Sequence, residues 1–144
     1  MRVLVQKCLS ASVSIDNKVY NNIKKGLVVF VGFTDNDNSE KIDYMINKIP
    51  KLRIFEDENG VMNESLLDVQ GEILSISQFT LYGDASNGNR PSYVKAMKRE
   101  KATILYDEFN KKLNNLVPTK TGVFGADMKI ALINDGPTTL LLER

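Results

Sequence analysis

The chain has 144 residues, 42% of them hydrophobic and 26% charged, a composition typical of one globular domain over residues 1–144. Its 19 Lys and Arg residues and 18 Asp and Glu residues leave a formal charge of +1, so contact with a polyanion requires a local basic patch. The chain has no histidine and a single cysteine, Cys8, which excludes imidazole catalysis, a histidine-ligated metal and an internal disulfide. An enzyme of this composition must work with hydroxyls, carboxylates, amines, backbone dipoles or groups of its substrate.

Strand-like patterns fill the first part of the chain. The run 26–33, GLVVFVGF, is short and apolar on both faces, which predicts a buried central strand. A hairpin turn is expected at Asp16-Asn17, because both residues tolerate the dihedral angles of a tight turn. The other strands of this part are expected at 2–9, 12–16 and 18–23.

A helix is predicted after the central strand. Asp37 and Glu40 fit a capping-box-like start, and Pro50 ends the pattern. Between them, apolar residues recur at i, i+3, i+4 and i+7, so they share one face of the helix. These residues are Ile42, Met45, Ile46 and Ile49. Two further strands are expected at 52–56 and 71–82.

The second half of the chain begins with its richest loop, 83–91. Ser92 is expected to cap a long helix over 93–114, whose apolar residues keep a near-helical spacing. The chain is then expected to end with two strands, at 128–134 and 138–143.

The order of these elements predicts the fold class. Strands outnumber helices by about seven to two, and most strand pairs follow one another directly along the chain. We therefore expect an α/β (α+β) fold in a single domain, a mainly antiparallel β-barrel or sandwich covered by two helices. No apolar run approaches the ~20 residues that span a bilayer, so no membrane contact is expected. The lone thiol favours a cytoplasmic location.

The first candidate site is Ser77-Gln78-Phe79-Thr80, where a buried strand runs out toward a glycine-rich loop. Strand ends direct side chains and free backbone N–H groups into clefts, which favours catalysis there. The plain alternative is that these hydroxyls bond only to nearby backbone. A nucleophilic hydroxyl also needs a base, and histidine is absent. The other route is attack by water while backbone N–H groups stabilise the oxyanion.

The second candidate is Gly136-Pro137, within the segment NDGPTT. Gly136 has no Cβ, so its carbonyl can approach another molecule closely. A Gly-Pro bond can be cis at a cost of about 0.5–1 kcal/mol, and a cis bond would turn two successive carbonyls the same way. The alternative is a plain turn between the last two strands.

Other reactive groups are weaker candidates. The basic residues Lys95, Lys98 and Arg99 are expected to share one helix face, either a solvated surface or a small phosphate-contacting patch for a few nucleotides. Cys8 is expected to be a buried small hydrophobe. The acidic residues of the turns form no recognisable metal-binding loop, so no metal ion is expected. They are Asp35, Asp37, Glu56, Asp57 and Glu58.

Six segments occur together in a distinctive order. They are MRVLVQK at the start, ASVSIDNKV, GLVVFVGF, SQFTL at 77–81, GNRPSY at 88–93 and NDGPTT at 134–139. In this order and spacing the chain resembles the D-aminoacyl-tRNA deacylases, long called D-tyrosyl-tRNA deacylases, over essentially its whole length. The pairing of the SQFT and Gly-Pro motifs is specific, whereas either motif alone is a weak signal.

The resemblance implies hydrolysis of the ester that joins a D-amino acid to the 3′-terminal adenosine of tRNA, with no metal or organic cofactor. It implies a homodimer with both active sites at the subunit interface. The SQFT residues 77–80 would line the pocket, and a cis Gly136-Pro137 would reach into the pocket of the other subunit. Phe124 and Met128, with the phenyl ring of the SQFT motif, would frame the adenine and the aminoacyl group.

Under this resemblance Thr80 is the best single candidate for a catalytic-site residue, as a nucleophile or as a residue that only lines the pocket. The ribose 2′-hydroxyl beside the ester could activate water in place of a protein base. The Gly-Pro carbonyls would accept hydrogen bonds from the α-ammonium group and form a wall that an L side chain strikes. Glycine should evade that wall, so some hydrolysis of glycyl-tRNA is expected.

The chain departs from the family pattern at Lys7, where members often carry an arginine that fixes the Gly-Pro loop. Lysine cannot make the same bidentate contact. Either another residue anchors the loop here, or chiral rejection is looser.

Two other functions fit the residues. A non-catalytic nucleic-acid-binding module is favoured if the basic face alone carries function, although the near-neutral charge argues against it. An esterase for small molecules is the weaker alternative, because a small ester brings no vicinal hydroxyl to replace the missing base.

Overall fold

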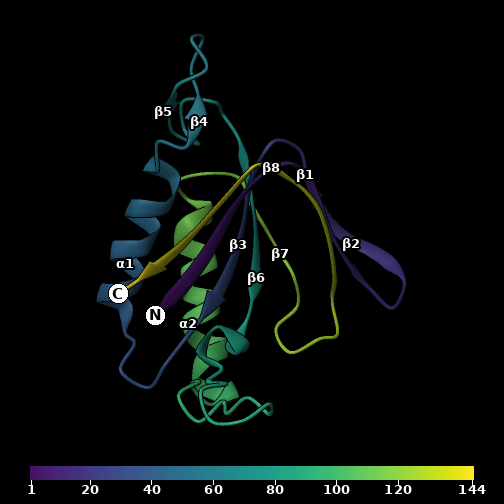
Figure 1. Ribbon diagram of the computed structural model, residues 1–144, viewed down its shortest axis with the longest axis vertical. Coiled ribbons are helices and arrows are strands. Elements are labelled where there is room, and N and C mark those ends of the chain that lie inside the picture. Colours follow the sequence, from purple (N-terminus) through teal and green to yellow (C-terminus); the bar gives the residue numbers. More distant parts are fainter.

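Six strands of the computed structural model, which describes residues 1–144, form one large sheet (Figure 1). Its strands lie in the order β2-β1-β3-β6-β7, and β8 pairs with β1. Their bounds are β1 Arg2–Ile15, β2 Lys18–Ile23, β3 Gly26–Gly32, β6 Glu72–Ser77, β7 Thr119–Thr121 and β8 Lys129–Glu143. Two short strands, β4 (Phe55–Glu56) and β5 (Met62–Glu64), form a separate hairpin.

The sheet curves until its two ends meet, so it is nearly a closed barrel. Strand β1 pairs antiparallel with β2, β3 and β8, whereas β3–β6 and β6–β7 are parallel pairs. The end strands β2 and β7 are joined by side chains: Asn21 Nδ2 donates to the Thr121 carbonyl at 2.7 Å, and Lys120 Nζ donates to the Asn22 carbonyl at 2.8 Å. The predicted α+β fold, a mainly antiparallel barrel-like sheet with two helices, is confirmed.

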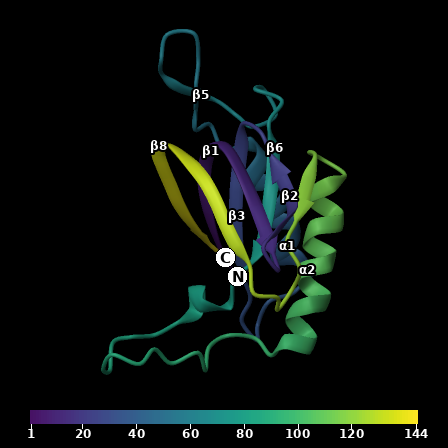
Figure 2. The same ribbon diagram turned by 90° about the vertical axis from the view of Figure 1, so that its right-hand side faces the viewer.

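Two apolar clusters hold the layers together. The larger cluster packs α1 (Ser39–Lys48) and α2 (Arg99–Asn114) on the sheet, and Figure 2 shows α2 running along it. The predicted apolar stripe of the first helix lies in this cluster and is almost fully buried. A smaller cluster fills the space on the other face, from Cys8 on β1 to Leu74 and Ile76 on β6. The run 26–33 is the buried central strand β3, as predicted.

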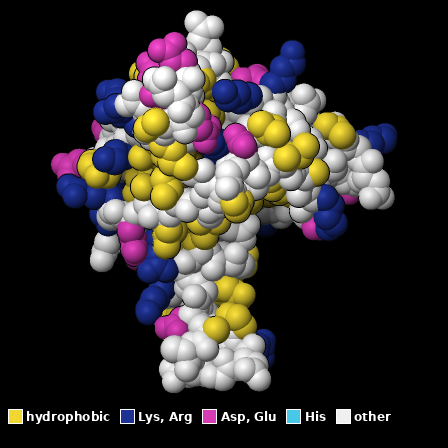
Figure 3. Space-filling view, turned by 45° about the horizontal axis from the view of Figure 1, so that its top comes forward, with side chains coloured by type: hydrophobic (Ala, Val, Ile, Leu, Met, Phe, Trp, Pro, Cys, Tyr) yellow, Lys and Arg dark blue, Asp and Glu magenta, His cyan; other side chains and the backbone are white.

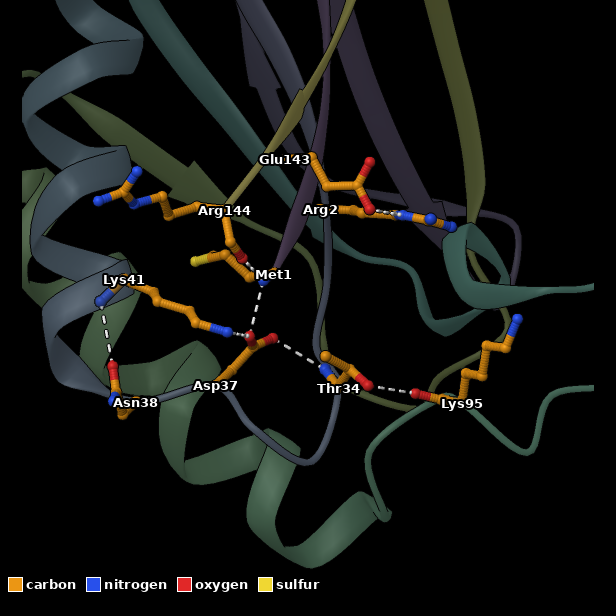
Figure 4. A network of polar contacts seen from close by, with 9 residues as sticks. All are labelled: Met1, Arg2, Thr34, Asp37, Asn38, Lys41, Lys95, Glu143 and Arg144. Atoms are coloured by element: carbon orange, nitrogen blue, oxygen red, sulfur yellow. Dashed lines mark hydrogen bonds and ion pairs between the residues drawn. The ribbon is translucent and has the colours of Figure 1, made fainter.

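The first helix begins one residue later than its sequence signal predicted. Asn38, not Asp37, caps α1, because the Asn38 side chain accepts a hydrogen bond from the Lys41 backbone N–H at 3.2 Å. The Asp37 carboxylate instead binds the Met1 amine at 2.6 Å, Lys41 Nζ at 2.9 Å and the Thr34 N–H at 2.8 Å (Figure 4). This network places both chain ends beside the start of α1.

The predicted helix over 93–114 is too long at its N-terminal side. α2 begins at Arg99, and Ser92 caps nothing, because Ser92 and Asp84 exchange two backbone hydrogen bonds of 2.8 Å. Met97 N–H donates to the Phe33 carbonyl at 2.9 Å, which ties the end of this stretch to the residue after β3. Residues 83–98 therefore form a projecting loop, seen as the narrow extension in Figure 3.

Because α2 begins at Arg99, the predicted basic helix face does not form. Lys95 and Lys98 lie in the projecting loop, before the helix, and only Arg99 belongs to α2. The expectation that the three residues share one helix face is wrong.

Other strand boundaries differ from the predicted ones, because two strands continue through irregular positions. The strands expected at 2–9 and 12–16 are one strand, β1, and those expected at 128–134 and 138–143 are one strand, β8. The predicted strand 71–82 ends at Ser77 and continues as the 3₁₀ helix η2 (Phe79–Tyr82). A second 3₁₀ helix, η1 (Ile49–Lys51), holds Pro50 and follows α1. None of the helices has the length and apolar character that a membrane crossing requires.

Candidate functional site

A cavity of about 620 Å³, called here the pocket, opens between the ends of β3 and β6, the projecting loop and the start of α2. Twelve of its 18 lining residues are hydrophobic. Five residues expected at the site line it: Ser77, Gln78, Phe79, Phe124 and Met128. The structure thus brings together two sequence segments that lie far apart in the chain.

The end of β6 explains why the SQFT segment faces this pocket. Ser77 is the last residue of β6, and the Gln78 N–H still donates to the Val31 carbonyl of β3 at 2.8 Å. The chain then turns into η2, which leaves Phe79 56% exposed. The Phe79 ring contacts Tyr93 of the projecting loop edge-on, with ring centroids 5.0 Å apart. An aromatic pair therefore stands at the mouth of the pocket.

Thr80 lies beside the pocket rather than in its wall. Its side chain is exposed, and its Oγ1 accepts a hydrogen bond from Gln78 Nε2. No carboxylate or amine is bonded to this hydroxyl, so no side chain is in place to take its proton. The backbone N–H groups of Phe79 and Thr80 start η2, where a helix leaves its first donors free, and Gln78 offers no side-chain cap.

The other wall of the pocket comes from the segment between β7 and β8. Phe124 packs on Tyr106 of α2 with ring centroids 5.8 Å apart. A Cβ added to Gly122 would lie 2.4 Å from Met128 Sδ, so a glycine is needed for Met128 to approach this closely. Sequence reasoning missed Tyr93 and Asp127 as lining residues: Tyr93 ends the GNRPSY segment, to which no place at the site was given, and Asp127 stands in none of the six segments.

The Gly136-Pro137 segment is a bulge inside β8, not a turn between two strands. Thr139 pairs with Gln6 and Asn134 pairs with Cys8, so the four residues 135–138 lie opposite the single residue Lys7. We call 134–138 the Gly-Pro bulge. The Gly136–Pro137 bond is cis, and Gly136 has φ +110°, in the region that favours glycine.

Hydrogen bonds and a buried lysine fix the bulge. Asn134 Nδ2 donates to the Lys7 carbonyl at 2.9 Å and to the Thr138 carbonyl at 3.1 Å. The fully buried Lys7 ammonium binds the Glu56 carboxylate at 2.7 and 2.8 Å and Asp135 Oδ2 at 3.3 Å. Burial opposes the charge, but these hydrogen bonds outweigh it and raise the pKa of Lys7. Lys7 therefore contacts the residue next to Gly136.

The bulge and the pocket lie toward opposite ends of the sheet in one protomer. Ser77 pairs with Val31, which pairs with Val3, whereas the bulge lies opposite Lys7. Four residues of strand, about 13 Å, separate these two levels. In Figure 1, η2 and the projecting loop lie at the bottom of the view and the bend of β8 near the top. Gly136 and Pro137 do not line the pocket of their own chain.

The remaining candidates have structural partners. Cys8 is fully buried, as expected, and burial raises the pKa of its thiol to about 11. Of the acidic turn residues, Asp37 binds the Met1 amine and Glu56 binds Lys7. No group of three or more His, Cys, Asp or Glu residues is arranged to hold a metal ion.

Comparison with known proteins shows the family to which the chain belongs. The family model described as D-Tyr-tRNA(Tyr) deacylase matches residues 4–143. A solved structure named "c-Myc DNA Unwinding Element Binding Protein" is 37% identical, with a TM-score of 0.95, and the match covers 100% of this chain and 99% of that one. A second, named "Structural Analysis of a probable eukaryotic D-amino acid tRNA deacylase", is 18% identical, with a TM-score of 0.82, and the match covers 98% and 97%. At that identity it supports the fold alone.

A match over nearly the whole chain defines a class of enzyme: a hydrolase that acts on the ester of aminoacyl-tRNA. The chain belongs to the D-Tyr-tRNA(Tyr) deacylase family, and it is a D-aminoacyl-tRNA deacylase.

Proposed function

We propose that this deacylase works as a homodimer in which each Gly-Pro bulge completes the pocket of the partner and rejects L-aminoacyl-tRNA. The position of the bulge carries this proposal: it is held rigidly, yet it lies away from the pocket of its own chain. A second copy can bring a bulge and a pocket together. The released products are a free D-amino acid and tRNA.

The surface around the bulge supports a dimer. β8 pairs only with β1, so one of its edges is free, and exposed edges are surfaces on which other chains pack. Large apolar side chains are exposed on β8 and on the adjacent part of β1: Ile133 is 58% exposed, Leu141 54% and Leu9 51%. A partner that covers them would gain the free energy of their burial.

Hydrolysis at this pocket proceeds without a protein base. The N–H groups of Phe79 and Thr80 stabilise the oxyanion that forms when water attacks the ester carbonyl, and each such donor contributes about 2.7–4 kcal/mol. The 2′-hydroxyl of the terminal ribose accepts the proton of the attacking water while it passes its own proton to the departing 3′-oxygen, so it ends the step as a hydroxyl again. Thr80 lies beside the pocket, where its hydroxyl accepts the hydrogen bond from Gln78 and takes no covalent part in the reaction.

Rejection by the carbonyls of the Gly-Pro bulge explains why one enzyme can act on esters of many D-amino acids. Backbone carbonyls of Gly136 and Pro137 read the α-ammonium group and the Cα–H, which every D-amino acid shares, and do not read its side chain. An L side chain would occupy the space of those carbonyls. Glycine carries no side chain to strike them, so the enzyme hydrolyses some glycyl-tRNA as well.

The test compares D-tyrosyl-tRNA and L-tyrosyl-tRNA at equal enzyme concentration, with the oligomeric state measured on the same sample. We expect a dimer that hydrolyses the D ester far faster than the L ester. Equal rates on both esters, or a monomer with full selectivity, would overturn the proposal.

A second candidate function is nucleic-acid binding without hydrolysis. The name of the 37% identical structure describes a DNA-binding protein, which favours it. The net charge of +1 and the loss of the predicted basic helix face argue against it. Steep salt-dependent binding to DNA by a protein that leaves D-tyrosyl-tRNA intact would select this function instead.

A further inference from the structure

The pocket wall contains one unpaired charge. Among its lining residues Arg99 is the single cation and Asp127 the single anion. Both carboxylate oxygens of Asp127 accept from Lys129 Nζ at 2.8 Å, so this anion has a cation partner at the surface. The Arg99 guanidinium forms no hydrogen bond or ion pair with the chain; only its backbone carbonyl is bonded, by the Thr103 hydroxyl at 2.8 Å. The pocket therefore presents five free guanidinium N–H donors.

Arg99 is exposed to solvent, but its guanidinium lies close to the opposite wall of the pocket. Arg99 is the first residue of α2, and its side chain packs over Gly125 in the wall opposite. A Cβ added to Gly125 would lie 2.8 Å from Arg99 Nη2 and 2.9 Å from Cζ. The absence of a side chain at Gly125 thus leaves the space that the guanidinium fills, next to Phe124.

A planar guanidinium matches the oxygens of a phosphate group, which it binds through two parallel hydrogen bonds. The remaining wall is mostly apolar, and a cavity of about 620 Å³ is of the size that holds a small organic ligand. An aminoacyl-adenosine inserted there leads out of the pocket through one phosphodiester. That phosphodiester is the only anionic group close to the ester.

We propose that Arg99 binds the phosphodiester on the 5′ side of the terminal adenosine and so positions the aminoacyl ester against residues 77–80. Arg99 is a positioning residue and not a catalytic one. The proposal rests on the hydrolysis at this pocket proposed above, and it gives Arg99, alone of the three basic residues expected to contact phosphate, a place in the pocket wall.

The experiment uses three D-tyrosyl esters that differ in the group on the 5′-oxygen of the adenosine: D-tyrosyl-tRNA, 3′-O-D-tyrosyl-adenosine 5′-monophosphate and 3′-O-D-tyrosyl-adenosine, the last two differing by the phosphate alone. The full-length wild type, Arg99→Ala and Arg99→Lys are compared, with Lys101→Ala as a matched control. Lys101 is an exposed cation of the same helix that lies outside the pocket. Thermal unfolding of each variant verifies that the fold is intact.

We expect Arg99→Ala to lower kcat/KM about ten- to hundredfold on both phosphate-bearing esters and less than about twofold on the nucleoside ester. Arg99→Lys should recover part of the lost kcat/KM, since it keeps the positive charge but loses the paired N–H donors of the guanidinium. Equal losses on all three esters, or no loss on any, would overturn the assignment. A wild type that cleaves none of them refutes the deacylase function itself, which is a distinguishable result.

Discussion

The pocket and the Gly-Pro bulge differ in how their residues are held. The pocket is lined mainly by apolar side chains, and its SQFT segment carries exposed groups with few polar partners. The bulge is irregular backbone tied by Asn134, by the fully buried Lys7 and through it to Glu56. The comparison indicates a division of roles: one region gives room and free donors, and the other gives a rigid surface.

Each region lacks what the other has. In the proposed mechanism the pocket holds the adenosine, and the bulge of the partner reads the handedness at Cα. Rigid backbone is suited to rejection, because it cannot yield to an L side chain. Free N–H groups beside an apolar cavity are suited to stabilising a developing charge. Variants of each region should therefore fail in different ways.

Gly136→Ala should have the largest effect, on selectivity. The new Cβ would lie 2.6 Å from Thr138 Oγ1 and 2.9 Å from Thr138 N, at a φ of +110°. Displacing the bulge carbonyls by about 1 Å should reduce the ratio of D- to L-tyrosyl-tRNA hydrolysis about a hundredfold. Gly60→Ala is the control, because Gly60 has φ +73° but open space around it. An unchanged ratio in Gly136→Ala would remove the bulge from chiral selection.

Lys7→Met should destabilise the fold and loosen the bulge. The variant leaves Glu56 and Asp135 without their shared ammonium, so the free energy of unfolding should fall. Urea denaturation measures this loss, and the D/L hydrolysis ratio should fall with it. Lys51→Met, at an exposed position, should change neither quantity. A stable variant with lower selectivity would confine the role of Lys7 to the bulge, whereas full selectivity would contradict the anchoring.

Thr80→Ala should have a small effect on rate. The hydroxyl has no base beside it, so kcat should stay within about fivefold of wild type in single-turnover hydrolysis of D-tyrosyl-tRNA. Removal of a true nucleophile costs about 10⁴-fold or more. A loss of that size would establish covalent catalysis and refute the water mechanism.

The smallest expected effect is a change with pH in the stability that Glu56 contributes to the fold. The hydrogen bond from Lys7 holds the pKa of Glu56 below its ordinary value of about 4.5. A depressed carboxyl pKa stabilises the fold above the unfolded value, and the contribution disappears as pH falls. The stability difference between wild type and Glu56→Gln should thus be present near pH 7 and shrink below about pH 4.5. Chemical unfolding over this range, with Glu58→Gln as control, measures it; parallel curves at every pH would contradict the linkage.

Local patterns predicted those parts that depend on nearest neighbours. The apolar run of β3 and the stripe of α1 lie in the core, and Asp16 and Asn17 adopt positive φ values in the predicted hairpin. Ser77, Gln78 and Phe79 line the pocket because they lie where β6 ends, and the end of this strand was recognisable in the sequence.

Tertiary contacts decided what the sequence did not show. α2 starts at Arg99 because Ser92 pairs with Asp84 and Met97 is bonded to Phe33. Asp37 leaves the cap of α1 because it binds the Met1 amine, which is distant in sequence. The bulge was mistaken for a turn, since an interrupted ladder within one strand has the same local signal as a break between two.

Mixed dimers test the central claim most directly. One subunit carries Ala96→Trp, whose indole fills the pocket, and the other carries Gly136→Ala. If the bulge serves the partner, the one open pocket receives an intact bulge, and the mixed dimer hydrolyses D-tyrosyl-tRNA while it rejects L-tyrosyl-tRNA. If the mixed dimer instead hydrolyses L-tyrosyl-tRNA at half the rate of the Gly136→Ala homodimer, each bulge serves its own chain and the account is contradicted.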